Sequence, residues 1–310
     1  MTETERIVAQ GIVDADFLKP EVRDEYEVTA EAKKIWAIEI DLLRKFDEVC
    51  RKHGLRYWAG FGTMLGAVRH HGFIPWDDDV DVWMPREDYN KLLKLPQSEF
   101  GAPFFLQTTM NDDDYYSAFA RLRNSNTTGI LVSKYNKCNN GIYMDIYPLD
   151  GLHPNKNLQM VNSYNVRIRN LMAHAYMFNI NPRLITRIIS KVLRSGIIPF
   201  NHRKTYQKVN RIAMKRKWAD ASEVGIVVFW PYAYAHNHFR KDAFQDTVYL
   251  PFEHISVPVP SGYKHVLRVL YGDFMKFPPV EQRGQWHDFF FEPDVDYKTY
   301  CSEHYGTKYQ

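Results

Sequence analysis

The hydrophobic residues between positions 29 and 53 recur at intervals of three or four, which is the repeat of one face of an α-helix. They are Ile35, Ile38, Leu42, Leu43, Phe46 and Val49. Thr29 can cap the first turn of this helix and Gly54 can end it. The pattern therefore predicts a helix over residues 29–53 whose apolar side packs against a sheet.

Shorter runs of β-branched and aromatic residues, separated by turn formers, predict strands. The predicted strands are 55–59, 79–83, 104–108, 115–123, 127–132, 224–230, 249–252 and 255–260, with another around Asp145. Further helices are predicted after Pro85, over 261–271, and over 155–218 with breaks near 181–182 and 195–196. We therefore predict an α/β (α+β) fold with a mixed sheet and a helical insert at about 151–220. Residues 1–28 show little periodicity and are predicted to form an N-terminal arm before a single domain over 29–310.

Composition narrows the class of protein. A chain of 310 residues with 45% hydrophobic content can bury a core of ordinary size. Its three cysteines, Cys50, Cys138 and Cys301, are too widely spaced for a zinc or disulfide framework. No apolar run approaches the roughly 20 residues that span a bilayer, and the polar start lacks the apolar core of a signal peptide. We therefore expect a cytoplasmic protein.

Charge is distributed unevenly along the chain. Residues 151–218 contain fourteen Lys and Arg and no Asp or Glu, so the rest of the chain is net acidic. Such a segment suits nucleic acid, anionic lipid headgroups or an acidic polymer. Within it, Arg183, Arg187, Lys191 and Arg194 lie opposite an apolar face of Leu184, Ile185, Ile188, Ile189, Val192 and Leu193. That face either closes a core or lies on the inner face of a membrane.

The clearest candidate chemistry lies in residues 60–83, where a glycine-rich turn precedes four carboxylates. Gly60 and Gly62 allow a tight turn, Thr63 can cap a short helix, and free N–H groups at a helix start attract phosphate. The apolar stretches on both sides of the carboxylates argue against a solvated acidic loop.

The four carboxylates belong to Asp77, Asp78, Asp79 and Asp81. On an extended strand, Asp79 and Asp81 point to the same side. Like charges held this close need a neutralising partner, and hard oxygen ligands suit Mg²⁺ or Mn²⁺. The stretch therefore predicts a divalent-cation site.

Other polar residues have two readings on pattern alone. Arg121 and Arg123 share one face of a strand and suit either surface acids or a donor phosphate. Asp145 lies in an apolar strand, where an acid needs a cation or hydrogen bonds. Asp150, in Leu-Asp-Gly, is interpreted as a turn residue. His236 and His238 could bind a metal, but without a third ligand nearby we interpret them as surface or pocket residues.

The stretch from Gly60 to Trp83 resembles the LicD family, relatives of the fukutin-type proteins. That family reads roughly Gly-Gly-Thr-Leu-Leu-Gly-Ala-Val-Arg-His, then Gly-Phe-Ile-Pro-Trp-Asp-Asp-Asp-Ile-Asp-Ile. Further similar stretches are 119–123, 142–151, 252–260 and 271–275, so the resemblance covers roughly 30–150 and 245–290. One departure is Phe61, which stands where the family usually has its first glycine.

The resemblance implies a nucleotidyltransferase-like mixed-sheet core. It also implies transfer of a phospho-alcohol, phosphocholine in the best-known members, from a CDP-linked donor to a glycan of the cell surface such as teichoic acid, lipopolysaccharide or capsule. The partners implied are the CDP-alcohol and the glycan acceptor, which is lipid-linked if the basic helices contact the membrane. No nucleic acid partner is expected.

The resemblance also assigns roles to individual residues. Asp79, Asp81 and Asp145 would hold Mg²⁺ or Mn²⁺, and Asp145 would act on the acceptor hydroxyl. The residues expected to bind the donor are Gly62, Thr63, Arg69, Asp78, Arg121 and Arg123. If the head group is choline, Trp76 is the best of the tryptophans near the motif to face its quaternary ammonium group.

Two other classes of protein share some of these features. A metal-dependent glycosyltransferase also grips a nucleotide-sugar diphosphate with Asp-x-Asp, but the glycine turn and the acid at 145 favour phospho-alcohol transfer. A non-catalytic glycan-binding protein has no need of three acids, so a turnover assay separates it from both enzymes.

Overall fold

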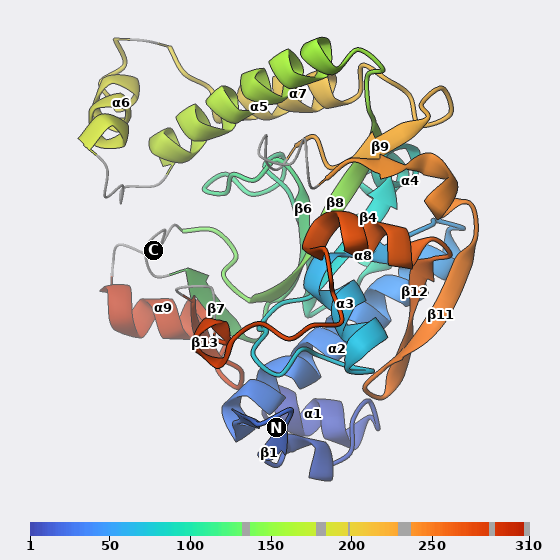
Figure 1. Ribbon diagram of the computed structural model, residues 1–310. Coiled ribbons are helices and arrows are strands. Elements are labelled where there is room, and N and C mark those ends of the chain that lie inside the picture. Colours follow the sequence, from blue (N-terminus) through green and yellow to red (C-terminus); the bar gives the residue numbers. More distant parts are fainter. Residues whose placement is uncertain (132–136, 178–183, 198, 229–236, 285–288, 307–310) are drawn as a thin grey trace.

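A computed structural model describes residues 1–131, 137–177, 184–197, 199–228, 237–284 and 289–306 (Figure 1). Among these residues, seven strands form a central mixed sheet around β8, whose ten residues are all buried. β8 runs parallel to β4 and antiparallel to β6 and β9. Farther from β8, β3 pairs with β4, β5 pairs with β6, and β10 pairs with β9. The seven strands are β3 (Trp58–Ala59), β4 (Asp81–Pro85), β5 (Phe104–Gln107), β6 (Ala120–Asn124), β8 (Ile142–Gly151), β9 (Glu223–Gly225) and β10 (Phe239–Arg240).

The helix predicted over 29–53 is confirmed as α2 (Ala30–Lys52), which Thr29 caps by accepting a hydrogen bond from the N–H of Ala32. α2 packs against β6 and β8. α3 (Phe61–Arg69) connects β3 to the acidic loop, and α4 (Arg86–Leu92) begins directly after β4. The predicted mixed α/β fold is confirmed.

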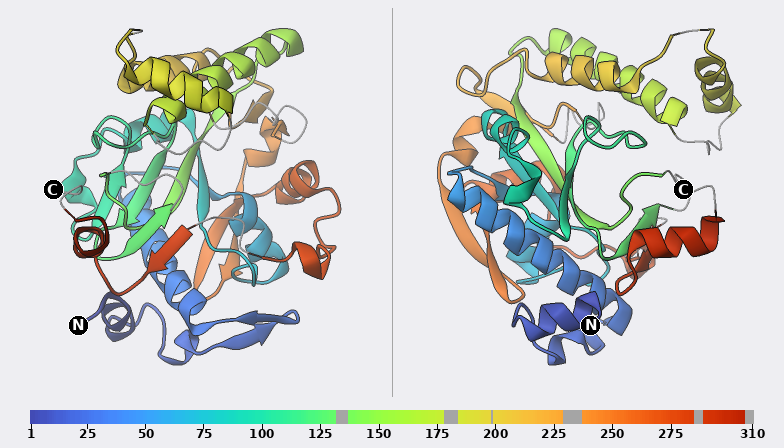
Figure 2. Two further views of the ribbon diagram at one scale, coloured as in Figure 1. Left: turned by 90° about the vertical axis from the view of Figure 1, so that its left-hand side faces the viewer. Right: turned by 180° about the vertical axis from the view of Figure 1, so that it is seen from behind.

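Smaller elements surround this sheet (Figure 2). β1 pairs with β2, β11 with β12, and β7 with β13. The strands of these pairs are β1 (Glu21–Arg23), β2 (Tyr26–Val28), β7 (Thr128–Leu131), β11 (Thr247–Phe252), β12 (Ile255–Pro260) and β13 (Phe289–Glu292). The remaining helices near them are α8 (Tyr263–Tyr271), α9 (Tyr297–Tyr305) and the 3-10 helices Asp16–Leu18, Gln97–Glu99, Lys241–Phe244 and Val280–Gln282.

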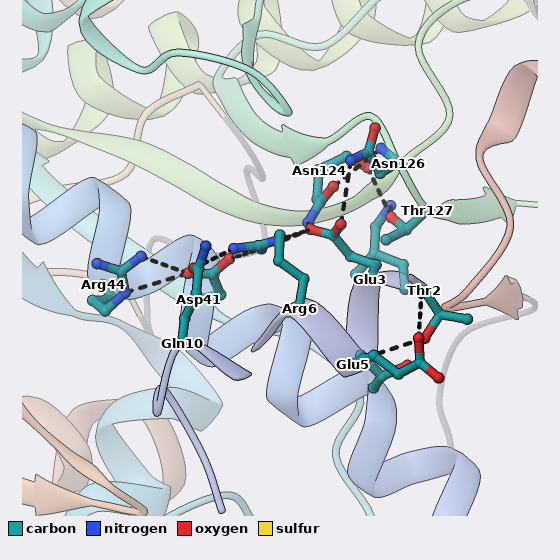
Figure 3. A network of polar contacts seen from close by, with 12 residues as sticks. Thr2, Glu3, Glu5, Arg6, Gln10, Asp41, Arg44, Asn124, Asn126 and Thr127 are labelled. Carbon is teal, nitrogen blue, oxygen red and sulfur yellow. Dashed lines mark hydrogen bonds and ion pairs between the residues drawn. The ribbon is translucent and has the colours of Figure 1, made fainter. Parts of the chain in front are cut away.

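Residues 1–28, expected as an arm, pack on α2. α1 (Glu3–Ala9) begins with a capping box between Thr2 and Glu5, and the side chain of Ile7 is fully buried. Arg6 forms ion pairs with both Glu3 and Asp41 of α2 (Figure 3). Glu3 also accepts a hydrogen bond of 2.6 Å from the side-chain amide of Asn124 on β6. This polar network ties the N-terminal segment to the central sheet.

The basic insert forms a separate layer of helices at one end of the molecule (Figures 1 and 2). It contains α5 (Lys156–Met177), α6 (Leu184–Arg194) and α7 (His202–Ala213), and α5 packs against both of the others. In the described part of the predicted amphipathic helix, Leu193 is buried while Ile188 and Val192 are exposed. Arg183 and the side chains of residues 184–187 lie outside the described part of the chain. No helix of the described residues is long and apolar enough to cross a bilayer.

A buried ion pair joins this layer to the sheet. Arg86 of α4 donates to both carboxylate oxygens of Asp150, at 2.6 and 2.8 Å, and to the side-chain oxygen of Asn210 on α7 at 2.7 Å. The interpretation of Asp150 as a turn residue is therefore wrong. Asp150 is fully buried near the end of β8, because Arg86, distant in sequence, supplies the guanidinium that an acid needs there.

Candidate active site

Three charged residues of the predicted site lie in register across neighbouring strands. Asp81 on β4 is paired with Asp145 on β8, and Asp145 is paired with Arg121 on β6. Residues opposite each other in a sheet point to the same face, so the three side chains form one row. The Nε of Arg121 lies 2.6 Å from Oδ1 of Asp145, and the hydroxyl of Tyr147 donates to its Oδ2 at 3.1 Å. The acid predicted in the apolar strand is thus held by an arginine and a tyrosine.

Backbone and hydroxyl contacts fix Asp81 at the start of β4. The hydroxyl oxygen of Thr63 accepts the N–H of Asp81 at 2.8 Å, and the carbonyl of Asp81 accepts the N–H of Gly60 at 2.8 Å. The role of Thr63 as a helix cap is therefore wrong: Gly60 occupies the cap position of α3, and the Thr63 hydroxyl secures β4 instead.

The surrounding protein groups do little to offset the negative charge of Asp81. The residue is 7% exposed, and its Oδ1 accepts no hydrogen bond from the residues that the structure describes. Burial raises the pKa of Asp81 well above its ordinary value, and the charges of Asp79 and Asp145 raise it further. A charged Asp81 therefore requires a cation beside it.

The acidic loop before β4 offers the oxygen ligands that such a cation needs. Carboxylate oxygens of Asp77, Asp78 and Asp79 lie within 4.8 Å of one another, and Asp78 is buried. A side chain at Gly62 would collide with the carboxylate of Asp77, so the missing Cβ lets the loop approach the first turn of α3. This donor set could hold a divalent metal ion, because hard cations such as Mg²⁺ and Mn²⁺ prefer carboxylate oxygens.

The acids that the structure groups together differ from the expected metal ligands Asp79, Asp81 and Asp145. Asp79 lies with Asp77 and Asp78 in the loop, while Asp145 is in an ion pair with Arg121. The two groups of acids are still close enough for Asp79 to raise the pKa of Asp81.

The sequence analysis missed Glu39, a buried acid on α2 beside the loop. Its side chain is 1% exposed, and its Oε2 has no hydrogen-bond partner among the described residues. Burial raises the pKa of Glu39 well above its usual range, and Asp79, Asp78 and Asp77 raise it further. The preceding helical turn contacts the same loop, because the indole N–H of Trp36 donates to the carbonyl of Asp77 at 3.1 Å.

A signal for Glu39 was present in the sequence. The helical periodicity that predicts α2 places this acid on the apolar face, between Ile35 and Leu42. A charged residue on a buried helix face needs a reason, and the acidic loop supplies it.

The other two predicted phosphate-binding arginines make contacts within the protein. Arg123 is buried and donates to the side-chain oxygen of Gln107 and the carbonyl of Gly141. Arg69 donates to the carbonyl of Phe274 at 2.9 Å, so it fastens the segment after α8 to α3. Arg121 is the member of the three that contacts an acid of the row, and its guanidinium also lies 3.8 Å from the ring centre of Tyr143.

Of the histidines that could bind a metal, His238 contacts an acid outside the loop and the row. His238 forms an ion pair with Glu223 at 3.0 Å, and His236 lies outside the described residues. A groove of about 910 Å³ opens elsewhere, along residues 218–223 and 240–245. Its lining contains no acid of the loop or the row and does not include Glu39, so we place the candidate site by its carboxylates.

Comparison with known proteins agrees with this geometry. Residues 54–183, which contain the acidic loop and the whole row, match the family described as LicD/FKTN/FKRP, nucleotidyltransferase domain. Residues 54–183 therefore form a nucleotidyltransferase domain of this LicD family.

Individual relatives extend the comparison. The chain is 27% identical over 251 residues to the lipopolysaccharide cholinephosphotransferase LicD of Haemophilus influenzae, covering 80% of this chain and 92% of the relative. A stretch of 49 residues, 16% of this chain and 10% of the relative, is 45% identical to the ribitol 5-phosphate transferase FKRP of Homo sapiens. A stretch of 59 residues, 19% of this chain and 22% of the relative, is 46% identical to an uncharacterised protein of Rickettsia prowazekii. The chain is thus a LicD-type transferase of substituted phosphate groups.

The backbone at Phe61 has a conformation that favours glycine. Phe61 has a backbone φ of +36°, in a region that side chains other than glycine disfavour. Its ring packs edge-on against Trp83, at 5.0 Å between centroids, and against Tyr147 at 5.5 Å. In this LicD-type domain, aromatic packing beside the row therefore accompanies backbone strain.

Proposed function

We propose that this protein transfers a phospho-alcohol from a CDP-linked donor to a hydroxyl of a cell-surface glycan, with Mg²⁺ or Mn²⁺ bound. The observation that carries the proposal is the row of Asp81, Asp145 and Arg121 beside the acidic loop. Phosphocholine is the phospho-alcohol we favour, because the relative aligned over 92% of its length is named a cholinephosphotransferase.

In this proposal, some of the acids hold the cation on the donor and another acts on the acceptor. Asp79 and Asp81, with the neighbouring loop acids Asp77 and Asp78, would hold the cation on the donor diphosphate. A divalent cation there stabilises the negative charge that develops on the transferred phosphate. The N–H groups of Gly62 and Thr63 in the first turn of α3 would bind phosphate oxygens, because the first N–H groups of a helix have no acceptor within it.

Asp145 would orient the acceptor hydroxyl and accept its proton. The acceptor oxygen then forms a bond to the phosphorus that carries the alcohol, the bond from that phosphorus to the CMP oxygen breaks, and CMP leaves. Arg121 and Tyr147 fix the carboxylate of Asp145 in one orientation, at 2.6 and 3.1 Å. Arg121 would also offset charge on the donor phosphates, while Arg69 and Arg123 would contribute at longer range from their contacts within the protein.

Trp76 is our candidate contact for the head group. It is 5% exposed, and the guanidinium carbon of Arg283 lies 5.0 Å from the centre of its ring. This indole therefore already attracts one cation, which a choline group would join or displace. Replacing Trp76 with Leu should raise the Michaelis constant for CDP-choline more than that for CDP-ribitol. An equal rise for both donors would assign Trp76 to packing with Arg283.

The experiment that tests the function is a donor panel. The protein is incubated with Mg²⁺, a glycan acceptor and CDP-choline, CDP-ribitol, CDP-glycerol or nucleotide sugars, and released CMP is measured. We expect CMP from a CDP-alcohol and none in the presence of a chelator. Turnover of a nucleotide sugar alone would make the protein a glycosyltransferase, and absence of turnover with every donor would leave a binding protein.

We further propose that the protein works at the cytoplasmic face of the membrane, where a lipid-linked glycan acceptor is accessible. The basic insert supports this placement, because its fourteen Lys and Arg have no acids among them in the sequence.

A further inference from the structure

α5 differs from an ordinary surface helix because it buries polar residues beside Val166 and Ala173 and exposes large apolar ones. The side that faces the protein buries Gln159 and Asn162, and Asn170 there contacts the hydroxyl of Tyr116 at 2.7 Å. The opposite side exposes large apolar residues, with Val161 60% and Ile168 57% exposed. A surface helix normally buries its apolar side and exposes its polar one. The outward face of α5 is therefore suited to contact an apolar partner.

Five of the six large apolar residues that α5 exposes, all except Met160, form one continuous stripe. They are Leu158, Val161, Tyr164, Ile168 and Leu171, separated by three or four positions. This spacing keeps them on one side of the helix over about 20 Å. Single exposed hydrophobic residues are common, but a row of this length marks an interaction surface.

The neighbouring helix α7 carries a matching basic stripe. Lys204, Lys208 and Arg211 are exposed and separated by four and three positions, so they share one side of α7, and the exposed Lys215 follows in the turn after the helix. α5 and α7 pack side by side along the same end of the molecule (Figures 1 and 2). The ammonium group of Lys215 donates to the side-chain oxygen of Asn162 at 3.1 Å, which links the two helices.

We propose that the outer surface of α5 and α7 docks on an anionic lipid bilayer. The apolar stripe of α5 would enter the boundary between headgroups and acyl chains, while the lysines and arginine of α7 would lie against the headgroups. This proposal does not depend on which phospho-alcohol the protein transfers.

The chemistry of the surface favours lipid over two other partners. Nucleic acid would use the basic stripe, but a row of aliphatic side chains on α5 has no counterpart on a phosphate backbone. A second copy joined by a twofold axis would bring an acid-free surface against itself, which like charges oppose. A bilayer offers negative charge and an apolar interior together.

The test is co-sedimentation of the full chain with vesicles of phosphatidylcholine alone or mixed with phosphatidylglycerol. The basic variant combines Lys204→Gln, Lys208→Gln and Arg211→Gln, and its matched control combines Lys94→Gln, Lys264→Gln and Lys298→Gln. All six side chains are exposed, and the two variants lose the same charge. At about 1 kcal/mol for each basic residue near the surface, the basic variant should bind anionic vesicles roughly a hundredfold more weakly, and the control about as wild type.

The apolar stripe is tested separately with Val161→Ser, Ile168→Ser and Leu171→Ser, against Val22→Ser on β1, another exposed valine. Only the α5 variant should lose vesicle binding, while circular dichroism shows that both remain folded. Failure of wild type to bind anionic vesicles, or equal loss in the stripe variants and their controls, would overturn the proposal. So would sedimentation of wild type as a dimer that the α5 substitutions convert to a monomer, because a second copy would then cover the stripe.

Discussion

At the scale of single residues, our proposal separates carboxylates that could hold a cation from Asp145, which would act on the acceptor. Asp79 lies among the ligand oxygens of the loop, and Asp145 is held in position by Arg121 and Tyr147. Asp81 lies between these groups and feels the charge of both. Substitutions of Asp79 and of Asp145 should therefore differ in their effect on cation binding.

We expect Asp79→Asn to weaken binding of the cation and Asp145→Asn to leave it largely intact, while both reduce turnover by about a hundredfold or more. Titration with Mn²⁺, followed by electron paramagnetic resonance, measures binding apart from turnover. Near-normal turnover of Asp145→Asn would remove it from the mechanism. Unchanged Mn²⁺ affinity of Asp79→Asn would remove the cation from the loop.

Phe61 provides a second test at this scale. Both Phe61→Ala and Phe61→Gly lose the packing against Trp83 and Tyr147, but only glycine relieves the backbone at φ +36°. We therefore expect the glycine variant to be the more stable of the two by about 1 kcal/mol, measured by urea unfolding. An alanine variant as stable as the glycine variant would mean that position 61 carries no strain.

At the scale of elements, the helical layer is fastened to the sheet through Arg86, which joins α4, β8 and α7. Removing one partner of a buried ion pair leaves the other charge without compensation. Arg86→Met should thus destabilise the protein by about 3–5 kcal/mol. Adding Asp150→Asn should recover part of this loss because it removes the unpaired charge. Additive losses in thermal unfolding of the double variant would show that the two residues act independently.

At the scale of the whole molecule, buried acids should make stability depend on pH and on divalent cations. The raised pKa of Glu39 means that the folded protein keeps a proton that the unfolded chain releases above its ordinary value of 4.5. Stability without cations should therefore fall as pH rises above that value, by at most about 1.4 kcal/mol per pH unit for one proton.

The measurement is the unfolding temperature in chelator between about pH 5 and about pH 8. Glu39→Gln should flatten this dependence, and Mg²⁺ should raise the unfolding temperature of wild type by binding the folded state. Chelator should also inactivate the enzyme reversibly, with activity restored by Mg²⁺ or Mn²⁺. If the unfolding temperature of wild type and of Glu39→Gln changes equally with pH, this acid does not titrate as its burial implies.

The sequence by itself determined the features that depend on neighbouring positions. Helical spacing was sufficient for α2, and short apolar runs rich in β-branched and aromatic residues were sufficient for the strands that carry Asp81 and Asp145. The motif with its acids was sufficient for the LicD family. These signals are local, because the period of a helix or strand is set by the backbone.

Tertiary structure decided which distant side chains meet. Glu39 became part of the acidic site because α2 lies along the loop, and Asp150 became a buried partner because Arg86 approaches it from α4. The sequence of α5 gave no warning that a row of its large apolar residues faces outward, because burial depends on what packs against a helix as well as on its own sequence. A charged or apolar side chain takes its role from the partner that the fold brings to it, and that partner can lie anywhere in the chain.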